Sequence, residues 1–155
     1  MPRLDIDFNL FDKETSKLYG LVSNLNNLSA FYQKLVAEII LLRLFSLLEN
    51  AISSICIKIA CGANYLDGTN PILLNRASSF QSAIFLFRNY SRARVRNNLN
   101  WAIGREIKEN IKYIIDPIDN LFSTIDNFSS IITEIRYVRN RIAHNNIISR
   151  NNYLN

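Results

Sequence analysis

The residues best suited to chemistry lie near the end of the sequence, in the stretch EIRYVRNRIAHNN at positions 134–146. It contains the only histidine of the chain, His144, five positions after Arg139, and Asn140 lies between them. An imidazole with an ordinary pKa of about 6.5 transfers protons at neutral pH, and a guanidinium is a fixed positive charge that binds phosphate. These residue types together are suited to catalysis on a phosphodiester. The simpler interpretation is a histidine at a helix C-terminus, where the helix dipole favours it.

A helix over this stretch has two different sides. At about 100° per residue, one narrow stripe is entirely aliphatic, and we expect it to face the core. It consists of Ile131, Ile135, Val138 and Ile142. The other side is polar around one small residue. It consists of Arg136, Arg139, Asn140, Ala143 and His144.

Arg139 and His144 stand at opposite margins of this polar side, about 140° apart. One helix does not readily bring their side chains onto a single small group. The same helix of a second protomer, packed over Ala143, would complete the site from both sides. The spacing therefore predicts a composite site at a two-fold interface.

The segment VRNRIAHN, residues 138–145, resembles the R-x(4–6)-H signature of HEPN domains (higher eukaryotes and prokaryotes nucleotide-binding). Arg139 and His144 match the arginine and the histidine, and Asn140 matches the polar residue that commonly follows the arginine. The residue-by-residue match covers positions 139–144, near the end of a chain whose length is compatible with the family. The resemblance implies an all-α domain.

The resemblance also implies a function. Many HEPN domains are metal-independent endoribonucleases, usually dimeric, in toxin–antitoxin, abortive-infection and CRISPR-associated defence systems. For this chain it implies RNA as the substrate, attack of the RNA 2′-OH on the adjacent phosphate, no cofactor, and an antitoxin or defence-system partner. HEPN toxins paired with a minimal nucleotidyltransferase resemble R-x4-H-x-Y, and Asn146 stands in place of the tyrosine, which disfavours that partner. The alternatives are a non-catalytic HEPN module that binds RNA, a nucleotide or a protein, and a plain helical scaffold.

Arginine is clustered in two parts of this chain, whose net charge is +5. No acid occurs between Asp67 and Glu106 or after Glu134, and ten of the twelve arginines lie in these two windows. Guanidinium groups bind phosphates in a bidentate manner, so such clustering is typical of a surface for a polyanion. The predicted RNA contacts are Arg136, Arg141, Arg92, Arg94 and Arg96. A solvated basic face would show the same pattern.

The scarcity of glycine and proline indicates long helices with few tight turns. The periodicity and the breakers predict helices over 13–27, 29–61, 79–90, 100–115 and 127–147. Ser29 and Gly62 are the expected cap residues of the long helix, and Asp119 is a cap before the last one. No segment shows strand alternation. We predict one all-α domain over 1–155, a bundle of about four to six helices with the long helix packed on the last.

Glu49 lies in the middle of the long predicted helix, among leucines and isoleucines. A half-buried carboxylate there usually pairs with a cation. We therefore predict that Glu49 faces the last helix and bonds Arg136 or Arg139, which would orient that guanidinium.

Other features argue against several classes of protein. The first residues carry acids where a signal peptide would be apolar, and the apolar stretch 35–48 is too short and too charged to span a bilayer. Cys56 and Cys61 would point about 140° apart on one helix, so no disulfide is expected. Neither has a CxxC neighbour or a histidine at metal-ligand spacing, so no zinc site is expected. No acidic cluster accompanies the motif, and no metal is expected. These observations favour a cytoplasmic protein without membrane contact.

Overall fold

The computed structural model describes residues 2–90 and 99–144, without the side chains of Tyr90 and His144. Its elements are α1 (Asp5–Ser23), a 3₁₀ turn η1 (Leu25–Asn27), α2 (Ala30–Ala60), α3 (Phe80–Tyr90), α5 (Gly104–Ile111) and α6 (Asn120–His144). Within the described ranges there is no strand, only an isolated antiparallel bridge between Leu73 and Ile115. The predicted all-α fold, with a very long helix packed on the motif helix, is confirmed.

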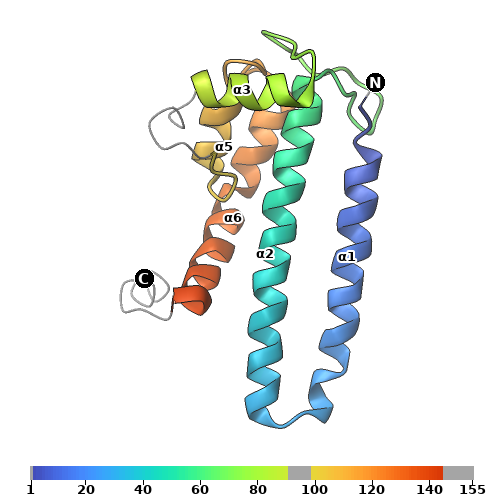
Figure 1. Ribbon diagram of the computed structural model, residues 1–155, viewed down its shortest axis with the longest axis vertical. Helices are drawn as coiled ribbons and strands as arrows, with labels where there is room; N and C mark the ends of the chain where they lie inside the picture. Colours follow the sequence, from blue (N-terminus) through green and yellow to red (C-terminus); the bar gives the residue numbers. More distant parts are fainter. Residues whose placement is uncertain (1, 91–98, 145–155) are drawn as a thin grey trace.

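The long hairpin of α1 and α2 dominates the molecule (Figure 1). α6 runs antiparallel to α2 on the side away from α1, while α3 and α5 gather at the end where α2 finishes and α6 begins (Figure 1). None of the described helices is both long and apolar enough to cross a membrane.

α1 begins at Asp5, well before the predicted start at residue 13. Its first turn carries Asp5 and Asp7, and carboxylates favour the positive end of the helix dipole. Asp7 also accepts hydrogen bonds from Lys58 Nζ at 2.6 Å and from Ser54 Oγ at 2.7 Å, so it ties the start of α1 to the end of α2. These contacts lie far apart in sequence, so periodicity alone does not reveal them.

The ends of α2 agree with the prediction. Ser29 occupies the N-cap position with extended backbone angles, although its side chain makes no capping hydrogen bond. Gly62 ends the helix with φ +85°; its N–H donates to the Ile59 carbonyl at 2.7 Å, and Ala63 N–H donates to the Lys58 carbonyl at 3.0 Å. This is the Schellman arrangement, which glycine favours because it has no Cβ.

The core lies at one end of the hairpin, between the second half of α2, α3, α5 and the first half of α6. The largest fully buried side chains are Phe87, Ile59, Ile107, Ile111, Ile114, Ile115 and Cys56. Gly104, the first residue of α5, lets that helix approach α6 closely, since a Cβ there would lie 2.5 Å from Ser129 Oγ. The first half of α6 is therefore firmly packed, and the motif lies on its continuation.

α6 begins at Asn120 instead of the predicted residue 127, and Asp119 is the reason. The buried carboxylate of Asp119 caps the helix by accepting from Leu121 N–H at 2.8 Å. It also accepts from Ile72 N–H at 2.7 Å and from the Tyr65 hydroxyl. Burial and the neighbouring Asp119 carboxylate raise the pKa of Tyr65. One side chain thus fixes the start of the motif helix to the loop after α2.

Candidate active site

Three of the four polar motif residues are half-buried on the second half of α6: Arg136, Arg139 and Asn140. They follow directly from the packed first half of the helix, whose buried residues are Phe122, Ile125 and Ile132. Their helix runs beside the first half of α2 in the opposite direction (Figure 1). α2 is therefore the element that positions the motif side chains from within the same chain.

Arg139 is held by two contacts. Its guanidinium carbon lies 5.4 Å from the centroid of the Phe45 ring on α2, and its Nη1 donates to Asn140 Oδ1 at 2.9 Å. Phe45 is only 2% exposed, so the ring is a fixed platform. A guanidinium stacked on an aromatic ring and bonded at one edge keeps its other N–H groups for a ligand. The structure therefore orients Arg139 without neutralising its charge.

Asn140 is bonded to the arginine of the motif. Its side-chain oxygen accepts from Arg139, its neighbour in sequence, at 2.9 Å. Asn140 thus helps to fix the orientation of the Arg139 guanidinium. Phe45 was not singled out from the sequence, although it lies four residues before Glu49 and hence on the same side of α2.

Glu49 lies close enough to the motif for Arg139 and Arg136 to act on its charge. Burial raises the pKa of Glu49, and the two guanidinium groups partly counteract that effect. Among the described residues, Glu49 makes no hydrogen bond or ion pair with either arginine, so the predicted bond is not formed. The structure gives Glu49 a longer-range electrostatic role beside Arg139.

His144 is the last described residue of α6, and its side chain lies outside the description. Its backbone places it five residues after Arg139, which on a helix is a rotation of about 140°. The predicted composite site therefore stays a prediction, based on that rotation. The other predicted RNA contacts Arg92, Arg94 and Arg96 also lie outside the described residues.

The predicted apolar stripe of α6 does not form a packed core contact along its length. Ile131 is 49% exposed, so its assignment to the core is wrong. Val138 and Ile142 instead line an open groove of about 610 Å³ between α6 and α2. The physical reason is the course of α6, whose C-terminal end inclines away from α2 (Figure 1).

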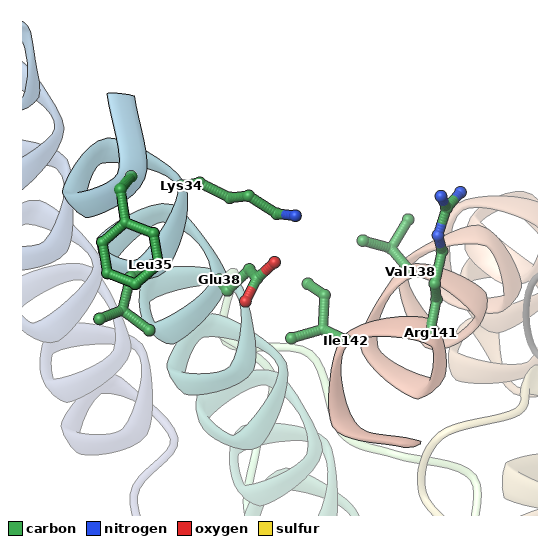
Figure 2. A pocket seen from close by; sticks show the side chains of 7 residues that line it. Lys34, Leu35, Glu38, Val138, Arg141 and Ile142 are labelled. Atoms are coloured by element: carbon green, nitrogen blue, oxygen red, sulfur yellow. The ribbon is translucent and has the colours of Figure 1, made fainter. Parts of the chain in front are cut away.

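Figure 2 shows this groove, with side chains from the two helices pointing toward one another. Its lining residues are Phe31, Lys34, Leu35 and Glu38 on α2 and Val138, Arg141 and Ile142 on α6. Arg141, predicted as a surface or phosphate-contacting residue, thus lies on the groove and not beside Phe45. Val138 and Ile142 make part of the α6 side apolar, whereas Lys34, Glu38 and Arg141 place charges of both signs on the groove.

Arg76 and the two cysteines have structural roles. Arg76 packs over Gly62 and donates from Nε to the Cys61 carbonyl at 3.3 Å. Cys56 and Cys61 are free thiols, as the sequence predicted, and burial raises the pKa of Cys56 to about 12. No group of three metal-ligating side chains occurs among the described residues.

The fold and the site define a helical bundle that presents an oriented arginine on its last helix. No family model, curated protein or solved structure gives a match to this chain.

Proposed function

We propose that this protein is a metal-independent endoribonuclease of the HEPN type, acting as a homodimer with a composite active site. The observation that supports this most is the fixed position of Arg139, which lies over Phe45 and is bonded to Asn140 on the helix that ends at His144. A cation placed in this way, with a histidine one and a half turns further along the helix, suits a phosphodiester better than a purely structural role.

The reaction follows from the chemistry of these groups. The RNA 2′-oxygen bonds to the adjacent phosphorus as its proton is removed, and the bond from phosphorus to the 5′-oxygen breaks as that oxygen gains a proton. The products are a 2′,3′-cyclic phosphate and a 5′-OH. His144 transfers protons, and Arg139 stabilises the charge that develops on the phosphoryl oxygens. Arg136 and Arg141, together with Arg92, Arg94 and Arg96, hold the RNA backbone.

Two chains are needed because Arg139 and His144 diverge on one helix. In a two-fold dimer, the arginine of one protomer and the histidine of its partner supply the two functions to one phosphate. Such an enzyme would serve as a toxin or in phage defence, with an antitoxin or another component of the system as its regulator.

The test is cleavage of RNA by the purified chain in EDTA. Wild type should yield 2′,3′-cyclic phosphate ends, and His144→Ala should reduce the rate by about 10²–10⁴ fold, the usual contribution of a proton-transfer group. Arg139→Ala should reduce it by about 10²–10³ fold. Arg105→Ala is the matched control, because Arg105 is an exposed arginine on α5.

No cleavage by wild type, or equal cleavage by wild type and His144→Ala, would overturn the catalytic proposal. Binding of RNA by wild type without any cleavage would assign the chain to the non-catalytic HEPN modules.

A further inference from the structure

The tip of the α1–α2 hairpin carries no charge. Residues 18–33 contain no Asp, Glu, Lys or Arg, in a chain whose net charge is +5. The tip extends beyond the end of α6, so the rest of the described molecule does not cover it (Figure 1). An uncharged protrusion on a basic molecule calls for a physical explanation.

Large apolar side chains surround this tip and face solvent. They are Tyr19 (77% exposed), Leu21, Val22, Leu28, Phe31 (73% exposed) and Tyr32 (56% exposed). At roughly 200 Å² for each large side chain, their exposed parts amount to roughly 600 Å² of surface. A stable interface buries about 800 Å² per partner, of which about 65% is apolar in homodimers. The tip therefore offers the apolar area that a stable dimer needs.

The tip is also organised before any partner arrives. Ser23 and Asn24 donate to the Gly20 carbonyl, and Gln33 donates to the Leu28 carbonyl at 2.9 Å. These bonds satisfy carbonyls of the turn and leave the apolar side chains outward. The rings of Phe31 and Tyr32 stack edge to face with centroids 5.4 Å apart. Such preorganisation lowers the entropic cost of binding.

The chemistry of the tip decides between partners. RNA binding requires cations, and the tip has none. A lipid surface would have to accept the asparagines of the turn, Asn24, Asn26 and Asn27, where insertion is deepest. A second copy meets neither obstacle, because two uncharged tips can approach without the like-charge repulsion that other faces of this basic chain would produce.

We infer that two copies of this chain associate through the uncharged tip of the α1–α2 hairpin. The tip is continuous with the groove between α2 and α6, because Phe31 and Leu35 line that groove together with Val138 and Ile142 (Figure 2). The two tips pack against each other about a two-fold axis, which the absence of charge on both of them allows. The contact between the tips then borders the groove of each protomer, next to its motif helix.

The inference deepens the proposed function and rests on it only for the effect on RNA cleavage. The association itself is measured without RNA, by sedimentation equilibrium over a range of concentrations. Wild type should reach twice the chain mass of 17.9 kDa. Phe31→Glu should raise the dimer Kd by at least about 30-fold, as expected for an aromatic residue in the centre of an interface.

Phe85→Glu is the matched control, since Phe85 is an equally apolar residue, 64% exposed, on α3, which lies at the end of α2 opposite the tip (Figure 1). It should dimerise like wild type. Wild type that stays at 17.9 kDa, Phe31→Glu that dimerises normally, or equal losses in both variants would each overturn the inference. A monomeric chain that instead sediments with uncharged phosphatidylcholine vesicles, while Phe31→Glu does not, would also overturn it and assign the tip to a lipid surface.

Cleavage assays separate this inference from the proposed function. A wild-type dimer that leaves RNA intact in EDTA would contradict the proposed ribonuclease activity but not the association through the tip. Full activity of Phe31→Glu at concentrations where it is monomeric would contradict the link between the tip and the composite site.

Discussion

Arg139 owes its position to a residue that is itself fully packed. Phe45 is buried on α2, so its ring cannot move aside without disturbing the bundle, and the guanidinium above it stays in place. Asn140 restricts the same group from its own helix. An arginine with restricted rotamers loses less entropy when it binds phosphate, so in the proposed ribonuclease Phe45 would contribute to the site without touching the substrate.

Phe45→Leu tests this role. The substitution keeps an apolar side chain but removes the ring, and should lower the free energy of unfolding by about 1–2 kcal/mol. RNA cleavage at 20 °C, where the variant stays folded, should fall roughly fivefold to tenfold through the lost cation–π contact. Urea unfolding and initial cleavage rates measure the two effects.

Phe87→Leu is the control for Phe45→Leu, because Phe87 is equally buried but packs edge to face with Trp101 instead of an arginine. It should lose similar stability and keep its activity. Equal losses of cleavage in both variants would mean that Phe45 acts through stability alone.

The charge of Glu49 gives a pH-dependent prediction. Its folded-state pKa is raised, chiefly by burial, so the fold favours the neutral carboxyl. The stability that Glu49 contributes is then fully present below its unfolded pKa and is lost as the pH rises through the folded pKa. Glu49→Gln should match wild type at about pH 4 and equal or exceed it at pH 7, with a Tm higher by no more than about 4 °C.

Thermal unfolding at both pH values checks this result, with the exposed Glu134→Gln on α6 as the control. A Glu49→Gln variant that is less stable than wild type at pH 7 alone would show that attraction to Arg139 and Arg136 outweighs burial.

At the scale of the elements, Gly62 has the most demanding position. Its φ of +85° is disfavoured for other residues, and a Cβ would lie 2.7 Å from Arg76 Cζ and Nε. Gly62→Ala should therefore lower the free energy of unfolding by about 1–3 kcal/mol. Loss of this helix end would also disturb the loop that carries Tyr65 to Asp119 and the start of α6.

Alanine substitutions at two other glycines, measured by urea unfolding, separate the backbone cost of Gly62→Ala from its steric clash with Arg76. Gly68 has φ +84° and open space where a Cβ would lie. Gly68→Ala should therefore lower the free energy of unfolding by the backbone cost alone, about 1 kcal/mol. Gly20→Ala lies within α1 with nothing near its Cβ, and should stabilise by about 0.5–1 kcal/mol. Gly62→Ala that costs no more than Gly68→Ala would show that Arg76 simply moves.

The helices could be predicted from the sequence where a local signal marks them. Ser29 and Gly62 bound α2 as expected, and Asp119 caps the last helix. The predicted start of α6 is too late although its cap at Asp119 is local. The predicted start of α1 is too late because Asp7 acts through partners some fifty residues away in sequence. Local periodicity carries no information on such contacts.

Only the polar residues of the candidate site could be predicted from the sequence. Arg136, Arg139 and Asn140 could be found from residue type and spacing, but Phe45 beneath Arg139 could not, since it has no chemistry of its own. The stripe with Ile131 was assigned to the core because a helical wheel cannot show that α6 inclines away from α2. The direction of a helix axis depends on packing along the whole bundle.

At the scale of the whole molecule, stability is unevenly distributed. Three of the five buried residues of α2, Cys56, Ile59 and Ala60, lie at the core end of the helix, Ile40 and Phe45 lie further along it, and the tip of the hairpin is mostly exposed. Segments with few buried contacts open with a lower free energy than the core. α2 should therefore be firm where it meets α3 and α5 and looser toward residues 18–33.

Hydrogen exchange followed by mass spectrometry tests this gradient. In dilute Phe31→Glu, amides near Cys56–Ala60 should exchange only through global unfolding, which costs about 5–15 kcal/mol, and amides of residues 18–33 should exchange faster by orders of magnitude. In concentrated wild type, the tip should gain protection because the second copy covers it, while Phe85→Glu should behave as wild type. Equally slow exchange along all of α2 in dilute Phe31→Glu would contradict the gradient, since the hairpin would then open only together with the core.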